Sequence, residues 1–273
     1  MPPPVAAPVR RPRRAFELFS RPYSVPASPF EAETADGVGL TGHRLGTGSA
    51  ALVFCHGFTG WHRKAKLVPF QEELARWFTV YAFDFRGHGD SEGRSSFGAK
   101  EHLDVEAVVR AARAEGFERV VTFGGSMGGI AVVRHAALVG GSDAVVAVST
   151  PARWSGHDNE AVRRMVWFTA TNPGRQLLRA WGTRVSLRWE GAEDPADLVE
   201  RISPVPLVIV HGRDDHYFDE EQAWLLYRRA REPKRLLLAS RFGHAEDGYG
   251  APFARQVAAA VGADSGAAVP VGA

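Results

Sequence analysis

Short apolar runs alternate with amphipathic segments along most of this chain. The apolar runs have the length and the continuous hydrophobicity of buried strands, and they cover residues 50–55, 78–83, 120–123, 144–148, 207–210 and 235–239. Helical spacing of apolar positions recurs between and after them, at residues 65–77, 100–115, 130–139, 219–231 and 253–261. Because apolar strands that alternate with amphipathic helices are typical of parallel sheets covered on both faces, the pattern predicts an α/β fold.

The ends of the chain differ from this pattern. The alternation over residues 30–45 turns at Asp36-Gly37 and predicts a β-hairpin at the start of the domain. Residues 1–29 are rich in proline and arginine, so we expect a disordered arm there. Residues 263–273 are rich in alanine and glycine and predict a flexible tail. A single folded domain is therefore expected over residues 30–262.

One long interval interrupts the alternation. Residues 151–204 lack a strong strand pattern and hold four of the seven tryptophans of the chain, which are Trp154, Trp167, Trp181 and Trp189. We interpret this interval as a small helical insertion that caps the carboxyl edge of the sheet. Its tryptophans either line a pocket for an acyl or aromatic-acid group or pack the insertion onto the sheet, and the sequence leaves both open.

Composition narrows the class of protein. Of the 273 residues, 45% are hydrophobic and 23% are charged, which is ordinary for a globular domain. The formal charge of +2 includes the arginine cluster at residues 10–14; the remainder is near neutral, so we expect no nucleic-acid partner. No apolar run reaches the roughly 18 residues of a membrane span. With no signal peptide and a single cysteine, Cys55, in an apolar run, we expect a cytoplasmic location without stable membrane insertion.

The strongest chemical signal is Gly124-Gly125-Ser126-Met127-Gly128-Gly129, between a predicted strand and a predicted helix. It fits G-x-S-x-G, in which a serine on a sharp strand-to-helix turn takes strained backbone angles and needs small neighbours. The turn exposes the hydroxyl, and the helix N-terminus behind it favours developing negative charge. We therefore predict Ser126 to be the nucleophile.

A serine hydroxyl is a weak nucleophile, so it needs a base and an acid that orients the base. His244 lies in a loop after the last predicted strand and just before the last helix, and we predict it to be the base. The acid is expected after the preceding strand, where Asp214 and Asp215 compete. The H-G-x-x-D spacing from His211 favours Asp215, and Asp214 would then be a solvated or turn-stabilising carboxylate.

Backbone amides complete the predicted site. The segment H-G-F-T-G at residues 56–60 follows a predicted strand at a point where an N–H group must help hold the oxyanion. We assign the oxyanion hole to the amides of Phe58 and Met127. These backbone roles place both residues at the site, where we expect them to touch substrate; what their side chains contribute to specificity is not readable from the sequence. The segment D-F-R-G-H-G-D-S at residues 84–91 is predicted to brace the turn beside the site.

Together these motifs resemble the α/β-hydrolase superfamily over about residues 30–262, including the chain order Ser, Asp, His. The segments at residues 56–60 and 84–91 and the insertion are similar to those of small bacterial carboxylesterases, among them cinnamoyl or feruloyl esterases and monoacylglycerol-lipase-like enzymes. The resemblance implies a mainly parallel eight-stranded sheet with helices on both faces and a small helical insertion. Gly125 departs from the pattern, because many relatives have histidine before the serine.

Other motifs indicate no cofactor. The segment G-V-G-L-T-G at residues 37–42 formally matches G-x-G-x-x-G, but no helix follows it. Residues 124–129 lack the Gly-Lys-Ser/Thr of a phosphate loop. The histidines show no H-E-x-x-H or comparable ligand spacing. We therefore predict neither a cofactor nor a metal.

The predicted reaction is hydrolysis of a small-molecule carboxylic ester by a serine esterase. Ser126 attacks the carbonyl, His244 accepts its proton, an acyl-enzyme forms, and water releases the acid. Two rivals stay open: a thioesterase or other acyl-transfer enzyme of a biosynthetic pathway, and a non-catalytic ligand-binding module on the same fold. The physiological substrate, the oligomeric state and the mobility of the insertion are not readable from the sequence.

Overall fold

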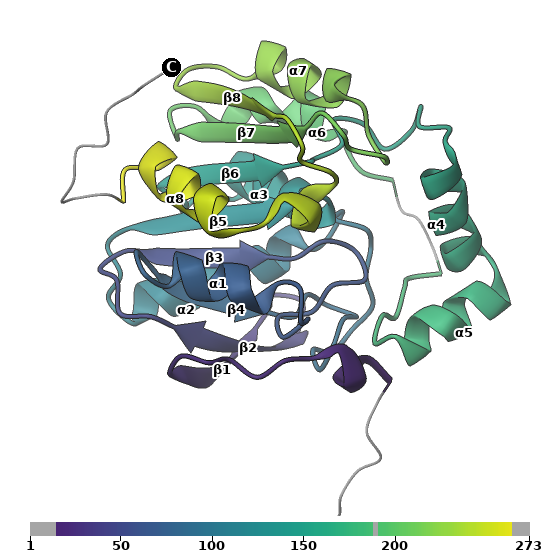
Figure 1. Ribbon diagram of the computed structural model, residues 1–273, viewed down its shortest axis with the longest axis horizontal. Helices are drawn as coiled ribbons and strands as arrows, with labels where there is room; N and C mark the ends of the chain where they lie inside the picture. The colour runs from purple at the N-terminus through teal and green to yellow at the C-terminus, as the bar shows by residue number, and fades with distance from the viewer. Residues whose placement is uncertain (1–14, 188–190, 264–273) are drawn as a thin grey trace, which may run out of the picture.

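The computed structural model describes residues 15–187 and 191–263. One sheet runs through the molecule in the order β1-β2-β4-β3-β5-β6-β7-β8 (Figure 1). β2 pairs antiparallel with β1 and β4, and all other neighbours are parallel, as the apolar pattern and the resemblance predicted. The strands are β1 (Ala27–Glu33), β2 (Gly39–Leu45), β3 (Ala51–Cys55), β4 (Thr79–Phe83), β5 (Val120–Gly125), β6 (Ala144–Val148), β7 (Leu207–Gly212) and β8 (Lys234–Ala239).

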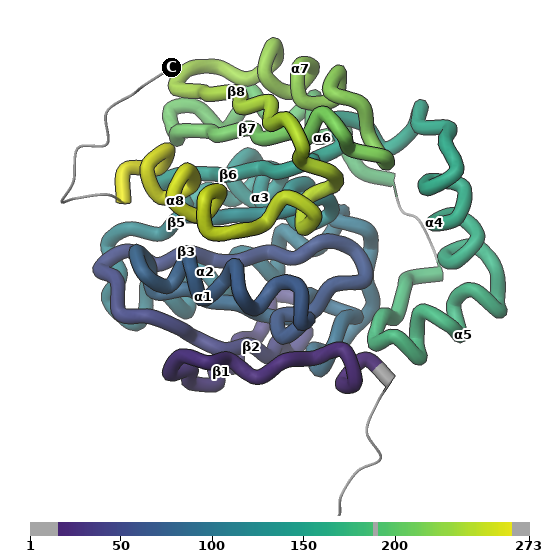
Figure 2. The backbone as a smooth tube through the Cα atoms, viewed as in Figure 1, coloured from purple at the N-terminus to yellow at the C-terminus, as the bar shows by residue number. Residues whose placement is uncertain are grey.

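Helices cover both faces of this sheet. α1 (Val68–Leu74) and α8 (Ala251–Ala260) pack on one face, which lies toward the viewer in Figures 1 and 2. α2 (His102–Ala114), α3 (Met127–Leu138) and α7 (Glu220–Arg229) pack on the other. The helical segments predicted from apolar spacing are thus all present, with ends that differ by a few residues.

The central strands are apolar throughout because they are buried on both faces. In β3, Val53 and Cys55 belong to the core beneath α2 and α3, whereas Leu52 and Phe54 belong to the core beneath α1 and α8. Successive side chains of a strand point to opposite faces, so a strand between two helical layers needs apolar residues at every position. Cys55 is fully buried in this way, as expected for a structural thiol.

A cap of two helices lies beyond the carboxyl ends of the parallel strands (Figure 1). It consists of α4 (Glu160–Ala170) and α5 (Asn172–Ala180). Each helix begins at a side-chain cap: the Asn159 carboxamide oxygen accepts a hydrogen bond from the Val162 amide, and the Thr171 hydroxyl accepts one from the Gly174 amide. Capping of this kind fixes where a helix starts.

The insertion predicted over residues 151–204 is shorter than expected. Its last part, α6 (Pro195–Leu198) and the 3-10 helix η2 (Val199–Ile202), packs on α3 as part of the domain core and not of the cap. The reason is its own apolar spacing, which buries Ala196, Leu198, Val199 and Ile202.

Part of the arm predicted over residues 1–29 is folded. A 3-10 helix η1 (Ala15–Phe19) buries the Phe16 ring, which meets the Trp61 ring edge-on at 5.5 Å between centroids. The Trp61 indole N–H donates to the Ser20 hydroxyl at 2.8 Å. Residues 15–29 therefore fold onto the domain, because aromatic burial prevails over the proline- and arginine-rich composition upstream. The rest of the predicted arm, 1–14, and the tail after residue 263 lie outside the described residues.

Among the described residues, no helix combines the length and apolarity needed to cross a bilayer. This agrees with the absence of a long apolar run in the sequence.

We predict that Phe16→Ala lowers the free energy of unfolding by about 3 kcal/mol, the usual cost of truncating a buried phenylalanine. Leu18→Ala is the matched control, since Leu18 lies on the same short helix and is 70% exposed. Urea denaturation of both variants measures the difference. Equal, small losses in both would contradict docking of η1 onto the domain.

Candidate active site

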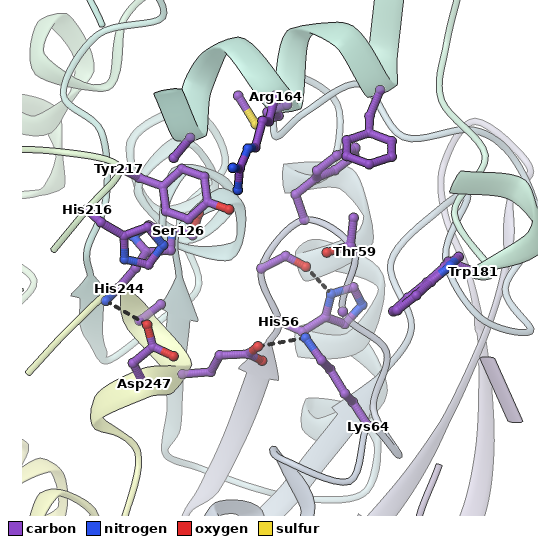
Figure 3. Close-up of a pocket in the computed structure, with 18 of the residues that line it drawn as sticks. His56, Thr59, Lys64, Ser126, Arg164, Trp181, His216, Tyr217, His244 and Asp247 are labelled. Carbon is purple, nitrogen blue, oxygen red and sulfur yellow. Dashed lines mark hydrogen bonds and ion pairs between the residues drawn. The ribbon is translucent and has the colours of Figure 1, made fainter. Parts of the chain in front are cut away.

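A cavity of about 620 Å³ opens at the carboxyl ends of the strands, beneath the cap. Ser126, His244 and Phe58 contribute to its wall from three separate loops. Figure 3 shows Ser126 and His244 at the cavity. The cap contributes mainly apolar side chains, which are Ala161, Met165, Phe168, Leu177, Leu178 and Trp181. The sheet topology thus brings the predicted nucleophile and base to one cavity.

The tryptophans of the insertion lie in different environments. Trp181 lines the cavity. Trp167 is 46% exposed on the cap, and Trp154 donates its indole N–H to the Glu193 carbonyl. Trp189 lies outside the described residues. Of the described tryptophans in the insertion, Trp181 alone therefore fits the pocket-lining interpretation.

Ser126 sits on a strained turn between β5 and α3. Its backbone angles are φ 55° and ψ −118°, and its amide donates to the Val148 carbonyl at 2.8 Å. A positive φ is costly for a residue with a Cβ and persists only where the surroundings enforce it. The strained turn predicted from G-x-S-x-G is therefore present.

Close backbone packing enforces this turn. A Cβ at Gly124 would collide with the Gly128 carbonyl one helical turn ahead, and a Cβ at Gly128 would collide with the Cys55 carbonyl of β3. Both positions need glycine because backbone, which cannot move aside, occupies the space of a side chain. The first turn of α3 is thereby held against the end of β3.

Gly125, where many relatives carry histidine, faces the side chain of Tyr249. A Cβ at position 125 would collide with the Tyr249 hydroxyl and lie 3.3 Å from the Cβ of Ala245. The Tyr249 ring stacks on Phe70 at 4.5 Å between centroids, and burial raises the pKa of its phenol. The tyrosine thus occupies the space beside the serine that a larger residue 125 would need.

Asp215 and His244 form a directly bonded pair. His244 Nδ1 lies 2.8 Å from Asp215 Oδ2, and the Asp215 side chain is fully buried while that of His244 is 13% exposed. The other carboxylate oxygen accepts hydrogen bonds from the amides of Tyr217 at 2.8 Å and Phe218 at 3.1 Å. Burial by itself would raise the pKa of Asp215, but the hydrogen bond and charge of His244 and these two amides lower it on balance.

Asp214, the neighbouring aspartate, takes no part in this pair. Asp214 is exposed, whereas Asp215 lies under the loop that carries His244. The structure therefore separates the two carboxylates that competed in the sequence, and the H-G-x-x-D spacing selected the one that contacts His244.

Two ion pairs connect the His244 loop to the loop after β3. The Lys64 ammonium lies 2.6 Å from the Glu246 carboxylate (Figure 3). Lys66 pairs with Asp247. Asp247 also accepts a hydrogen bond from the His244 amide at 3.2 Å. These contacts fix the two loops relative to each other on the floor of the cavity.

The turn after β3 is shaped by His56. Its Nδ1 donates to the Gly57 carbonyl at 2.8 Å, and its Nε2 accepts from the Phe85 amide at 3.1 Å. Burial lowers the pKa of His56 to about 3, so the ring is neutral at pH 7 and this tautomer satisfies both nitrogens. Gly57 is thereby placed beside the serine, since a Cβ there would lie 3.5 Å from the Cβ of Ser126.

Phe58 and Met127, the predicted oxyanion residues, differ in their side chains. Phe58 lines the cavity, as expected. The Met127 side chain points into the core, where it is 4% exposed and its sulfur accepts a hydrogen bond from the Ser95 hydroxyl. The Met127 side chain is therefore not among those that line the cavity. Its backbone amide opens α3 and belongs to a turn whose N–H groups have no partner within the helix.

The segment at residues 84–91 braces the site, as predicted. The buried Asp84 carboxylate accepts hydrogen bonds from the His62 amide at 2.6 Å, the His62 ring at 2.7 Å and the Asp90 amide at 2.9 Å. Arg86 is buried against Asp104 at 2.7 Å. A network with this many hydrogen bonds holds the loops on either side in one arrangement.

The sequence analysis did not single out several polar residues of the cavity, among them His216, Tyr217 and Arg164. His216 and Tyr217 follow Asp215 directly, and their position after the predicted acid was the available signal. The Tyr217 ring lies 4.6 Å from the His244 ring. Arg164 comes from the cap, and nothing in its local sequence pointed to the cavity. Within the part of the chain that the structure describes, no group of three or more His, Cys, Asp or Glu side chains is arranged to hold a metal ion.

Comparison with known proteins defines the class. Residues 52–272 match the sequence model of the alpha/beta hydrolase family. The chain therefore belongs to the alpha/beta hydrolase family. It is 28% identical over 249 residues to the uncharacterized protein YfhR of Escherichia coli O157:H7, a match that covers 83% of this chain and 79% of that protein.

Solved structures share the fold. The Pyrococcus furiosus esterase Pf2001 superposes with a TM-score of 0.70 at 23% identity, covering 88% of this chain and 93% of the esterase. The esterase RhEst1 from Rhodococcus sp. ECU1013 superposes with a TM-score of 0.64 at 20% identity, covering 86% of this chain and 98% of the esterase. The eight-stranded, mainly parallel sheet of an α/β-hydrolase is thus confirmed.

We predict that Gly125→Ala destabilises the protein by about 1–3 kcal/mol through overpacking against the Tyr249 hydroxyl. Adding Tyr249→Phe should recover part of this loss, because the ring carbon that bore the hydroxyl lies 3.4 Å from the new Cβ. A double-mutant cycle of unfolding free energies measures the coupling. Strictly additive losses would contradict the contact.

A second prediction concerns pH. The pKa of Asp215 is lowered by folding, so its carboxylate stabilises the native state above its unfolded pKa of about 3.9. That contribution is lost as the pH falls through the lower folded pKa. Urea denaturation at pH 7, 5, 4 and 3 should show the gap between wild type and Asp215→Asn shrinking at the acid end. A difference in unfolding free energy that does not change with pH would contradict the Asp215–His244 pair.

Proposed function

We propose that the protein is a serine esterase that hydrolyses small carboxylic esters through an acyl-enzyme on Ser126. The observation that carries the proposal is the 2.8 Å contact between His244 and the buried Asp215, in the same cavity as a serine on a strained turn. Membership in the alpha/beta hydrolase family supports hydrolase chemistry, and the esterases of the same fold favour esters.

The acylation step follows from this arrangement. The imidazole of His244 takes the proton of the Ser126 hydroxyl as it attacks the carbonyl carbon, and Asp215 keeps the ring in the right tautomer and stabilises the imidazolium. The amides of Phe58 and Met127 hold the negative oxygen of the tetrahedral intermediate. Losing one such donor costs about 2.7–4 kcal/mol of transition-state stabilisation.

The remaining steps release the products and regenerate the free enzyme. His244 gives its proton to the oxygen of the leaving alcohol, and the carbon–oxygen bond of the ester breaks. Water then attacks the acyl-enzyme with His244 as base, releasing the carboxylic acid and restoring the Ser126 hydroxyl. For this enzyme we retain the cytoplasmic location expected from the sequence.

We predict that Ser126→Ala lowers kcat for a short-chain p-nitrophenyl ester by about 10⁶-fold and abolishes labelling by a fluorophosphonate. Release of p-nitrophenol and mass spectrometry of the labelled peptide are the measurements, with acyl-thioesters in parallel to detect a thioesterase. If the folded wild type neither labels nor turns over any acyl length, the esterase proposal fails. The ligand-binding module then becomes the better description.

We predict further that Asp215→Asn lowers kcat by about 10⁴-fold, because the ring of His244 is then held in the wrong tautomer. Asp214→Asn is the matched control and should keep kcat within about twofold, since Asp214 is exposed. Steady-state kinetics on the same ester measures both. A loss in the Asp214 variant as large as in the Asp215 variant would show that the acid is misassigned.

A further inference from the structure

The cavity is lined by both polar and apolar side chains, and Arg164 and Trp181 lie on different sides of it. Among the described cap residues that line it, Arg164 is the charged one; the others are Ala161, Met165, Phe168, Leu177, Leu178 and Trp181. Arg164 extends from α4 toward the side of the cavity that holds Tyr217 and Ser126, whereas Trp181 lies across from it (Figure 3).

The charge of Arg164 reaches the catalytic side of the cavity. Figure 3 shows the Arg164 side chain extending toward Tyr217. Burial and the negative charges of Asp247, Asp215 and Glu246 raise the pKa of the Tyr217 phenol, and the positive charge of Arg164 opposes that rise. Tyr217 in turn packs against the His244 ring at 4.6 Å, and His216 flanks the same ring at 6.2 Å. Arg164, Tyr217 and His216 thus lie at one end of the cavity beside the base. The carboxylates of Glu246 and Asp247 also line the cavity, and they are paired with Lys64 and Lys66.

The Arg164 guanidinium has capacity for a ligand. It donates to the Glu160 carboxylate one turn earlier on α4, in a pair whose side chains are 72% and 71% exposed. A guanidinium carries five N–H donors, and an exposed pair at this spacing is weak. A carboxylate or phosphate of a substrate can therefore bind Arg164 through its remaining donors without breaking a buried interaction.

The position of the Arg164 end of the cavity relative to the scissile bond indicates which part of the substrate it contacts. In the proposed esterase reaction, His244 protonates the leaving alcohol, so the alcohol must lie on the His244 side of the scissile bond. The acyl group then extends toward the opposite side, where Trp181 lies (Figure 3). Arg164 stands on the alcohol side.

We propose that the substrates are esters of an apolar acyl group with an alcohol that carries an anionic group, a carboxylate or a phosphate, and that Arg164 selects them. This inference rests on the proposed esterase function and adds its substrate class. Arg164 is a specificity-determining residue here and takes no part in bond making or breaking.

The test uses three butanoate esters that share a phenyl ring and differ in its para substituent: a carboxylate, a phosphonate and a neutral carboxamide. Arg164→Gln should lower kcat/KM for the favoured anionic ester by about tenfold, mainly through KM, as for loss of one charge-assisted contact. The carboxamide ester should be unchanged. Comparing variant with wild type on each ester cancels differences between the leaving groups, and the two anionic arms distinguish carboxylate from phosphate recognition.

Two neighbours on the same helix provide controls. Arg163 pairs with Asp158 at 2.7 Å and does not line the cavity, so Arg163→Gln should leave all three esters unchanged. Glu160→Gln removes the competitor for the guanidinium and should increase the preference for the anionic ester. Added salt should reduce that preference in the wild type, since the group lies in an exposed position.

The outcomes separate the two proposals. Turnover of all three esters with no selective effect of Arg164→Gln, or with an equal effect of Arg163→Gln, overturns the substrate assignment and leaves the esterase intact. An equal loss on the carboxamide ester shows that Arg164 merely supports the cap and also overturns it. No turnover of any ester by the folded wild type overturns the esterase proposal and this inference with it.

Discussion

The site depends on one constraint, the backbone-to-backbone packing that holds Ser126 at a positive φ between β5 and α3. The carbonyl of Gly128 packs against Gly124, and the carbonyl of Cys55 packs against Gly128. These contacts hold the start of the helix against the central strands. A strained residue persists only where its surroundings over-determine it. Two apolar cores, one on each face of the sheet, supply the free energy that maintains this strain.

Buried polar groups then place the remaining parts around that turn. His56, kept neutral by burial, satisfies both ring nitrogens with backbone groups and aligns the loop that carries Phe58. Asp215 is held by two backbone amides before it contacts His244. Such groups are costly to bury unless every hydrogen bond is made, so the loops have few alternative arrangements. Rigid positioning of this kind is what transition-state stabilisation requires.

The two sides of the cavity have different physical origins. The predicted catalytic groups lie on loops that the sheet positions, whereas the cavity wall opposite them comes from α4 and α5, which stand beyond the strand ends and bury few residues (Figure 1). A cap with little core of its own can change its lining without loss of the fold. Arg164 and Trp181, at different places on this wall, give the cavity one polar and one apolar side.

The sequence by itself determined the sheet, the helices on both faces and the places of Ser126, His244 and Asp215. Apolar periodicity and glycine spacing are local, and the carboxyl ends of parallel strands necessarily share one edge. Only the tertiary structure decided the rest. Tyr249, distant in sequence, fills the space beside Gly125; the Met127 side chain enters the core; and Phe16 docks on Trp61. The role of Arg164 depends on how the cap lies over the sheet. Such contacts join segments with no common local pattern, and only packing in three dimensions creates them.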